Sequence, residues 1–453
     1  MPTRIAIVGA GPSGLFLYKE LVESGRTGLD ITIFESGKQL GSGFPYSDRG
    51  AGPEHVTNVS ANEIPDLVTP VKDWIQTVSP EKLEAYNIDP VRFNEYKVLP
   101  RLLFGDYLNS QFGELLNIAK KERIKTTVLI ETIVVDIYKS ADQKLIIKTY
   151  GSEENKYDIV AVCIGHKWPV KYEGKIPGYF DSPYPPAKLA IPINHAVAIK
   201  GASLTAIDAV STLARYNGHF YRDRNGKLYF SVNKSAPDFY LHLHSLDDLL
   251  PAIRFHLEDS YLLPDHILTE EEVNEYIKTH NGFLSLDYIF RINFLDPLKK
   301  RDPAIYGHIK NMRLEEFVET VMTQREKRDP FELFKAEYEE AERSIKKEKS
   351  IPWKELLATL SFAVNYPAKH FSAEDMLRLT RVLKPLISIV IAFVPQGCAD
   401  ELIALYDAGR LKLIDVDKDS EVIPNQDGGI IYKYADESGN VHSVKYKTFI
   451  DCT

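Results

Sequence analysis

Hydrophobic residues near the start of the chain form two short runs separated by an amphipathic segment. Residues 5–8 are continuously apolar, and residues 15–25 follow with apolar side chains at helical spacing. A second β-rich run, residues 31–34, comes next. Short continuous apolar runs are typical of buried parallel strands. The pattern therefore predicts a strand, a helix and a second parallel strand.

Strands and helices continue to alternate along the chain. Strand patterns lie at residues 127–130, 132–138, 144–150, 157–166, 239–245, 389–394 and 411–415. A second strand–helix start occupies residues 196–210. From residue 252 to 384 apolar residues recur at helical spacing among dense charge, which predicts a large α-helical insertion. The fold class expected is α/β, with two Rossmann-like domains and this insertion.

The turn after the first strand carries Gly9-Ala10-Gly11-Pro12-Ser13-Gly14. In a turn of the form Gly-x-Gly-x-x-Gly, the first glycine allows the tight turn and the second lets backbone approach a pyrophosphate. The third lets the helix pack on the strand. N–H groups at the helix N-terminus then bind the phosphates. Glu35 ends the second strand, where a carboxylate accepts hydrogen bonds from ribose hydroxyls. The sequence therefore predicts an adenine dinucleotide site formed by Gly9, Gly11, Pro12, Ser13, Gly14 and Glu35.

A weaker copy of this pattern begins at residue 196. Of its three glycine positions only Gly201 is kept, because Ser203 and Ala206 fill the other two. Ser203 has a Cβ where backbone should approach phosphate. The strand at 239–245 is followed by Leu-Asp-Asp, without an arginine that would bind a 2′-phosphate. Gly201, Ser203 and Thr205 are candidate contacts for a nicotinamide dinucleotide, and a purely structural turn is the alternative.

The composition is that of an ordinary globular protein. The 453 residues include 44% hydrophobic and 26% charged residues, with a formal net charge of −9. This charge argues against nucleic acid or an anionic membrane as a partner. The three cysteines form no Cys-x-x-Cys pair, so a disulfide framework, a zinc cluster and a redox dithiol are not expected. We expect a cytoplasmic protein with a small-molecule substrate and no metal site.

With its two strand–glycine-turn–helix patterns, the chain resembles flavoproteins with two dinucleotide-binding domains. It is most similar to FAD/NAD(P)-binding proteins related to flavin-containing and N-hydroxylating monooxygenases. The matching motifs cover most of the first 210 residues and, more loosely, the tail, but not the helical insertion. These motifs are residues 9–14, Glu35, and residues 41–46, 55–62, 100–108, 158–165 and 201–208.

The resemblance implies FAD in the first site and NAD(P)H in the second. The implied domains are an FAD-binding domain at 1–190, a second NAD(P)-binding-like domain at 191–251 and 385–445, and the insertion at 252–384. Residues 446–453 repeat the strand pattern of residues 158–165 and stop one position short of its glycine. We therefore expect the residues after 445 to belong to the FAD-binding domain. Its remainder would come either from a continuation of the natural polypeptide or from a partner.

The resemblance also implies roles for single residues. Residues expected to contact the cofactor are Gly43, Tyr46, Asn58, Arg101 and Gly165. Asn58 would lie near the flavin C4a and hold a peroxide adduct with its amide, and a turn-capping role is the alternative. His55 is a candidate proton donor, with a packed or solvent-facing histidine as the alternative. Arg101 would bind a cofactor phosphate or an acidic substrate, or else form a surface ion pair.

The leading hypothesis is an FAD-dependent oxidoreductase. It would be a monooxygenase that consumes NAD(P)H and oxygenates a small metabolite through reduced flavin and its C4a-peroxide. A second hypothesis is an FAD oxidase or dehydrogenase that its substrate reduces directly. A third is a non-catalytic dinucleotide-binding scaffold, whose insertion would bind a partner subunit or form a homo-oligomer. The sequence contains no Ser-His-Asp set, metal-binding histidine pair or Walker loop, which argues against hydrolases and kinases.

Overall fold

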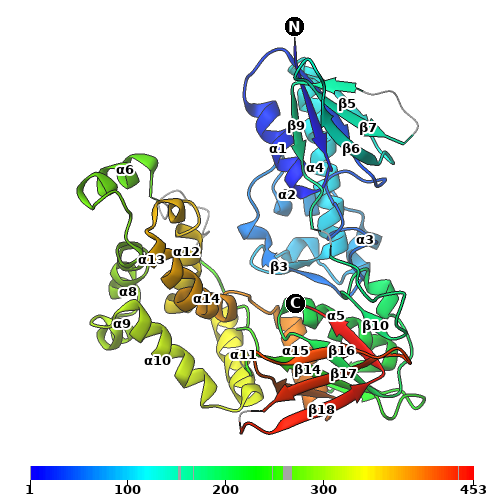
Figure 1. Ribbon diagram of the computed structural model, residues 1–453, viewed down its shortest axis with the longest axis vertical. Coiled ribbons are helices and arrows are strands. Elements are labelled where there is room, and N and C mark those ends of the chain that lie inside the picture. The colour runs from blue at the N-terminus through cyan, green and yellow to red at the C-terminus, as the bar shows by residue number, and fades with distance from the viewer. Residues whose placement is uncertain (1, 151–154, 167, 247, 259–267, 437) are drawn as a thin grey trace. The chain divides into compact units, whose positions relative to one another are not determined.

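The computed structural model describes residues 2–150, 155–166, 168–246, 248–258, 268–436 and 438–453. The chain forms two compact units, whose helices and strands are labelled in Figure 1. The first unit comprises Met1–Pro169 and Tyr184–Ala187, and the second comprises Val170–Pro183 and Lys188–Thr453.

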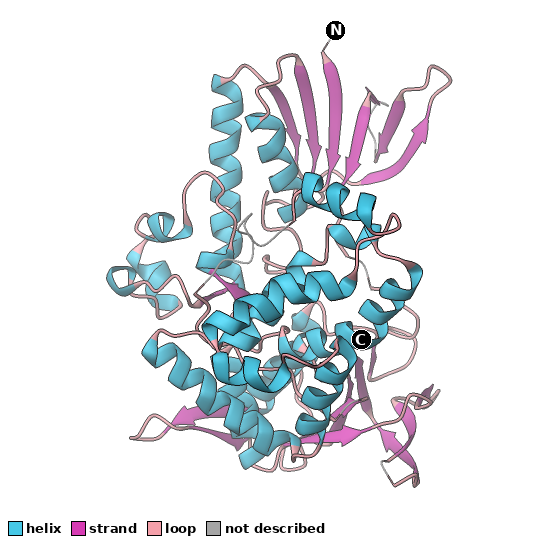
Figure 2. Cartoon of the chain, turned by 90° about the vertical axis from the view of Figure 1, so that its left-hand side faces the viewer, coloured by secondary structure: helices cyan, strands magenta, loops and turns pink. Residues whose placement is uncertain are grey.

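The first unit is built on a parallel sheet with the strand order β5-β2-β1-β9. Its strands are β1 (Thr3–Val8), β2 (Leu29–Phe34), β5 (Lys125–Leu129) and β9 (Ile159–Val162). Ile5 and Ile7 of β1 pack with α1 (Pro12–Glu23) and α4 (Arg101–Lys121), which lie along one face of the sheet (Figure 2). Ala6 and Val8 pack on the other face, with Ile147 and Tyr157 of a β-meander. Both faces of β1 are buried, which explains its continuous apolar run.

The remaining elements of the first unit are short. The meander consists of β6 (Val134–Lys139), β7 (Leu145–Thr149) and β8 (Asn155–Tyr157). A two-stranded antiparallel ribbon pairs β3 (Val56–Ser60) with β4 (Val98–Pro100). The chain segment that connects β3 to β4 contains, in order, η1 (Ala61–Glu63), α2 (Val71–Ile75), α3 (Pro80–Ala85) and η2 (Pro90–Arg92), of which η1 and η2 are 3₁₀ turns.

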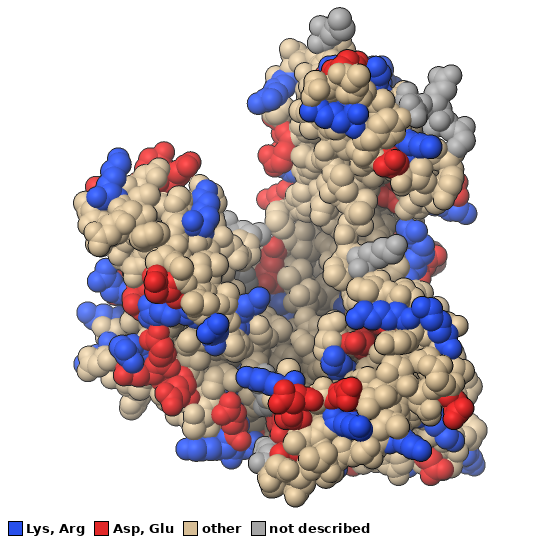
Figure 3. Space-filling model, in the orientation of Figure 1, with Lys and Arg blue, Asp and Glu red and all other residues tan. Residues whose placement is uncertain are grey.

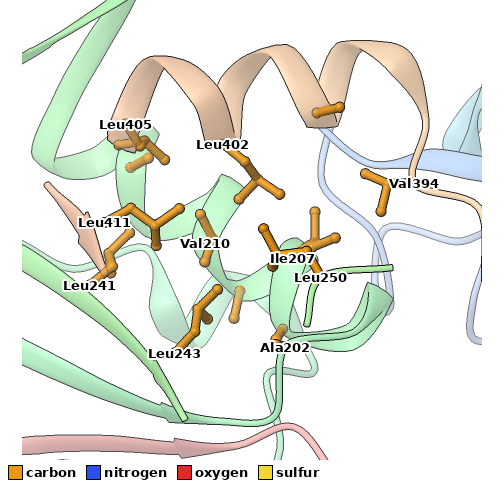
Figure 4. Close-up of a cluster of buried hydrophobic side chains, with 14 of the residues drawn as sticks. Ala202, Ile207, Val210, Leu241, Leu243, Leu250, Val394, Leu402, Leu405 and Leu411 are labelled. Atoms are coloured by element: carbon orange, nitrogen blue, oxygen red, sulfur yellow. The ribbon is translucent and has the colours of Figure 1, made fainter. Parts of the chain in front are cut away.

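The second unit contains another parallel sheet, with the order β10-β19-β11-β14-β15. Its strands are β10 (Tyr179–Phe180), β11 (Ala196–Lys200), β14 (Tyr240–Ser245), β15 (Leu411–Asp415) and β19 (Thr448–Asp451). One face packs on α5 (Leu204–Asn217) and α15 (Gln396–Asp407) through the apolar side chains of Figure 4. The other face packs on an antiparallel sheet of β16 (Glu421–Pro424), β17 (Ile430–Ala435) and β18 (Val441–Tyr446). A hairpin of β12 (Gly218–Arg222) and β13 (Leu228–Val232) follows α5.

Helices fill the part of the second unit between β14 and α15, as expected for the insertion. They are α6 (Glu270–Thr279), α7 (Leu286–Phe290), α8 (Asp296–Arg301), α9 (Pro303–Ile309), α10 (Leu314–Glu326), α11 (Pro330–Lys347), α12 (Pro352–Ala363), α13 (Ala373–Arg378) and α14 (Lys384–Val390). Most share a core of their own. Phe331, Phe334 and Ala341 of α11 instead join the core of the parallel sheet, which ties the helices to the second unit. The predicted α/β class with two Rossmann-like sheets and a helical insertion is confirmed.

One predicted strand is wrong. Residues 389–394 were expected to extend the sheet, but α14 runs to Val390, with Leu386 and Val390 buried one helical turn apart. Only Val394 makes a β-bridge, with Ile253. Short apolar runs do not distinguish a buried strand from a buried helix, and here packing in the helical core selects the helix.

Charged side chains of both signs alternate over the face seen in Figure 3, including the helical region at its left. No helix among the described residues is long and apolar enough to cross a membrane. No cluster of three or more metal-ligating side chains occurs in this described part of the chain.

Candidate functional site: two glycine turns at the ends of parallel strands

The first glycine turn has a geometry that requires its glycines. Gly9 has a φ of +98°, and its N–H donates to the carbonyl of Phe34 at 2.8 Å. A Cβ on Gly9 would lie 2.4 Å from the carbonyl oxygen of Cys163, which follows β9. A Cβ on Gly14 would lie 2.2 Å from the carbonyl oxygen of Gly9. The turn, α1 and the end of β9 are therefore packed backbone to backbone.

The N-terminus of α1 offers N–H groups to an anion. Gly11 is the N-cap residue, Pro12 follows it, and no described side chain caps this end of the helix. The first turn contains no acidic residue. Ser13 and Gly14 therefore present backbone N–H groups at the positive end of the helix dipole. This is the arrangement that binds a pyrophosphate.

Glu35 is buried beside this turn, with 5% of its surface exposed. Its Oε2 accepts a hydrogen bond from the N–H of Ala10 at 2.9 Å, and its Oε1 accepts from Gly37 at 2.6 Å. Oε1 also accepts from the hydroxyl of Ser36 at 3.3 Å, whereas Oε2 can accept a second hydrogen bond. The nearby guanidinium of Arg49, 4.0 Å from Oε1, was not anticipated from the sequence. The carboxylate suits a ribose diol and repels a 2′-phosphate.

The segment expected to line the cofactor lies against the same turn. The N–H of Gly41 donates to the carbonyl of Ala10 at 2.7 Å. Gly43 has a φ of +56°, and a Cβ there would lie 3.0 Å from the Cα of Gly11. Tyr46 meets Phe104 of α4 edge-on, with ring centroids 4.8 Å apart. Burial raises the pKa of the Tyr46 hydroxyl, and the charge of Arg101 opposes this.

His55, Asn58 and Arg101 gather around β3. The side-chain Nε of Arg101 donates to the carbonyl of Val56 at 2.8 Å. The backbone N–H of Arg101 donates to the carbonyl of His55 at 2.9 Å. The His55 ring is 2% exposed, and its Nδ1 accepts from the N–H of Gly52 at 3.0 Å. Its Nε2 lies 3.6 Å from a carboxylate oxygen of Glu54. His55 is thus a packed histidine, whereas Asn58 is exposed on β3. Their catalytic roles stay predictions.

Gly165 lies beyond the end of β9 and has a φ of +72°. After Gly165, the rings of His166 and Trp168 meet edge-on, with centroids 4.5 Å apart. The ring of Trp168 is tilted against that of Tyr184, with centroids 5.2 Å apart. Tyr184 in turn meets Phe44 edge-on at 6.5 Å. This aromatic cluster was missed because its members are far apart in sequence and belong to no periodic pattern.

The second glycine turn reproduces the first. Gly201 has a φ of +99°, and its N–H donates to the carbonyl of His244 at 2.8 Å, as Gly9 does to Phe34. Ser203 is the exposed N-cap of α5, with φ −92° and ψ −169°, close to the −70° and −168° of Gly11. This is extended backbone that serine adopts without strain. Thr205 lies in the first turn of α5.

The strand ends at the second turn differ from those at the first. Ser245 follows His244 as Glu35 follows Phe34, so a 9% exposed serine takes the place of the carboxylate. A Cβ on Gly201 would approach Thr453 and Cys452 at the end of β19, at 3.3 and 3.4 Å. The turn therefore lies at the ends of the neighbouring strands β11 and β19. The chain continues from β11 to β14 on one side, while β19 lies on the other, and dinucleotides bind at such a switch point of a parallel sheet.

Comparison with known proteins agrees with this geometry. Residues 6–167 match a family described as FAD-NAD(P)-binding, and residues 269–391 match the YdhS-like middle domain. The chain is 27% identical over 450 residues to the uncharacterized protein YdhS of Escherichia coli K12, covering 99% of this chain and 82% of that protein. It is 29% identical over 166 residues to flavin-containing monooxygenase 1 of Oryctolagus cuniculus, covering 36% of this chain and 28% of that protein.

Among solved structures, the lysine monooxygenase NbtG of Nocardia farcinica matches with 12% identity and a TM-score of 0.41. That match covers 100% of this chain and 80% of NbtG. The expected resemblance to FAD/NAD(P)-binding proteins is confirmed by the family match over the first unit. Two regions of the chain thus match known families: residues 6–167 match the FAD-NAD(P)-binding family, and residues 269–391 match the YdhS-like middle domain.

Proposed function

We propose that the protein is an FAD-dependent oxidoreductase whose first unit holds the FAD. The observation that carries this proposal is the pairing of Glu35 with Ala10 beside the uncapped N-terminus of α1. This pairing places a ribose acceptor next to a pyrophosphate cradle. The carboxylate selects against a 2′-phosphate, which FAD lacks and NADP carries.

When bound, FAD supplies the redox chemistry, and the residues of this chain bind and orient it. Glu35 would accept the ribose hydroxyls, and the N–H groups of Ser13 and Gly14 would bind the pyrophosphate. Gly11 and Gly43 let their two loops pack against each other, because a Cβ on Gly11 would lie 3.1 Å from the Cα of Gly43. Arg101 and Tyr46 would lie farther along the site, near the reactive end.

We further propose that a nicotinamide dinucleotide binds at the second turn and reduces the flavin. Its support is the repeated geometry of Gly9 and Gly201 and the matching backbone of Gly11 and Ser203. The finer proposal is a monooxygenase acting on a small metabolite, with Asn58 and His55 near the reacting atoms. The name of the rabbit relative, a flavin-containing monooxygenase, supports it.

One observation favours a second candidate, an FAD oxidase or dehydrogenase reduced by its own substrate. Ser245 replaces the carboxylate at the second turn, so this turn has no charged ribose acceptor at the position that Glu35 occupies in the first. Weak or absent nicotinamide binding would follow, and electrons would then come directly from the substrate.

An anaerobic titration separates the two candidates. The FAD-loaded protein is mixed with NADH or NADPH, and the flavin absorbance near 450 nm is followed. Bleaching by either nucleotide at a rate that Gly201→Val lowers supports reduction through the second turn. A flavin that neither nucleotide bleaches rejects this step and leaves the oxidase or dehydrogenase. The Gly226→Val variant, at a positive-φ hairpin glycine with open space around it, is the control.

A further inference from the structure

Three aromatic side chains of the first unit form a continuous strip, and none of them is among the residues of the proposed FAD site. The strip consists of Phe44, Tyr184 and Trp168, with ring centroids 6.5 Å and 5.2 Å apart along it. All three are half-buried, unlike the fully buried rings of Tyr18, Tyr107 and Phe112 in the core of the same unit. Each of the three residues therefore keeps part of its surface exposed.

The strip is fixed to the glycine turn at both ends. Phe44 follows Gly43, which touches Gly11, and Gly41 is hydrogen-bonded to Ala10. Trp168 lies a few residues after Cys163, whose carbonyl oxygen abuts Gly9. Both ends of the strip therefore follow, in sequence, segments that pack against the first turn.

The strand order gives the side of the site on which the strip lies. Glu35 ends β2, and β9 lies on the opposite side of β1. A dinucleotide crosses the strand ends with its pyrophosphate at the helix N-terminus. With the adenosine ribose at Glu35, the second half of the molecule extends beyond β1 toward β9. Trp168 follows β9 in sequence, which puts the strip on the side toward which the isoalloxazine would extend.

We propose that Phe44, Tyr184 and Trp168 form a wall that packs against the isoalloxazine ring of bound FAD. This inference rests on the proposed function, because it requires FAD in the first site. Aromatic surfaces suit a planar heteroaromatic ring through stacked or edge-to-face contact. The residues of the wall touch the cofactor and position it, and they take no part in proton transfer.

The test compares FAD with ADP as ligands of the full chain. ADP carries the adenosine and the diphosphate but no isoalloxazine, so it reports on the turn and Glu35 alone. Trp168→Leu should weaken FAD by roughly threefold to tenfold, the size of one aromatic contact, and leave the affinity for ADP unchanged. Bound FAD should also become several-fold more fluorescent, because a tryptophan or tyrosine in contact with isoalloxazine quenches its emission.

Two further variants make the test specific. Trp168→Tyr keeps an aromatic side chain and should restore most of the quenching. Trp353→Leu removes a similarly half-buried tryptophan from α12 in the second unit and should change neither affinity nor fluorescence.

Each result decides between the wall and a purely structural role. Unchanged FAD affinity and fluorescence in Trp168→Leu would overturn the wall while leaving FAD binding intact. Equal weakening of FAD and ADP would also overturn it, because the strip would then only support the fold. A wild-type protein that binds ADP but no FAD would overturn the proposed function together with the wall.

Discussion

The carboxylate of Glu35 accepts a hydrogen bond from the backbone N–H of Ala10, at 2.9 Å, and so links the end of β2 to the glycine turn that follows β1. The other carboxylate oxygen accepts from Gly37, at 2.6 Å. One buried side chain therefore holds two loops in position, and its Oε2, with Ala10 as its hydrogen-bond donor, can accept a further hydrogen bond from a ribose hydroxyl.

Replacing Glu35 should reduce FAD binding strongly. Glu35→Ala removes the ribose acceptor and leaves the buried N–H of Ala10 and the part-buried N–H of Gly37 without their acceptor, and the buried group alone costs about 1–3 kcal/mol. We expect FAD affinity to fall by at least tenfold, measured by fluorescence titration. Glu23→Ala, which removes an exposed carboxylate paired with Lys19 on α1, is the control and should leave FAD binding unchanged. Equal affinities in wild type and Glu35→Ala would contradict the assigned role.

Gly9 should tolerate no side chain. Gly9→Ala places a Cβ 2.4 Å from the Cys163 carbonyl oxygen at a φ of +98°, which costs about 1–3 kcal/mol in backbone strain alone and more for the clash. Gly25→Ala is a matched control in the same unit, at a φ of +66° with open space around it. In urea unfolding followed by tryptophan fluorescence, Gly9→Ala should lower the midpoint clearly more than Gly25→Ala. Equal shifts would show that the packed turn is not needed.

A buried ion cluster stabilises the helical region. Glu337 accepts from Arg325 at 2.7 Å and from Lys354 at 3.0 Å, and all three side chains are buried. Glu337→Ala leaves two buried cations without this carboxylate and should cost about 3–5 kcal/mol. Glu339→Ala, an exposed position on the same helix, should cost no more than about 0.5 kcal/mol. Thermal unfolding would show the difference.

The same cluster predicts an acid-sensitive helical region. Burial opposes ionisation of Glu337, but the charges of Lys354 and Arg325 outweigh it and hold its pKa below the usual 4.5. A carboxylate with a lowered pKa stabilises the fold above its unfolded-state pKa and loses this contribution as the pH falls through the folded-state value. The wild type should therefore lose stability below pH 4.5. In Glu337→Gln this component of the pH dependence should be absent.

His244 should make stability depend on pH in a higher window. Burial lowers its pKa from 6.5 to about 4, and the ring stacks on Tyr432 at 4.2 Å. The unfolded chain then binds a proton that the folded chain refuses, so stability falls as the pH drops from 6.5 to 4. The slope contributed by one such group is at most about 1.4 kcal/mol per pH unit. Urea unfolding across this range should show a smaller slope for His244→Phe, and an unchanged slope would contradict the prediction.

Local sequence patterns could predict the geometry of the first glycine turn because that geometry is set by nearby residues, and the cofactor contacts of the turn stay predictions. Gly9, Gly11 and Gly14 are fixed by a turn of six residues, and Glu35 by the length of one strand–helix–strand unit. The strand expected at 389–394 failed because its apolar run fits either element, and tertiary packing selected a helix. That Ser245 occupies the position equivalent to Glu35 became visible only from the matching hydrogen bonds of the two turns, Gly9 to Phe34 and Gly201 to His244. The aromatic strip required the fold itself, since residues 44, 168 and 184 meet only in three dimensions.

Retention of FAD by the full chain tests whether the first unit binds this cofactor through Glu35. The purified protein is incubated with excess FAD, freed of unbound ligand by gel filtration, and its flavin absorbance is compared with the protein concentration. We expect about one FAD per chain in the wild type and a large loss in Glu35→Ala, with Glu23→Ala like the wild type. A wild-type protein that retains no flavin, or a Glu35→Ala variant that retains as much, would contradict this expectation.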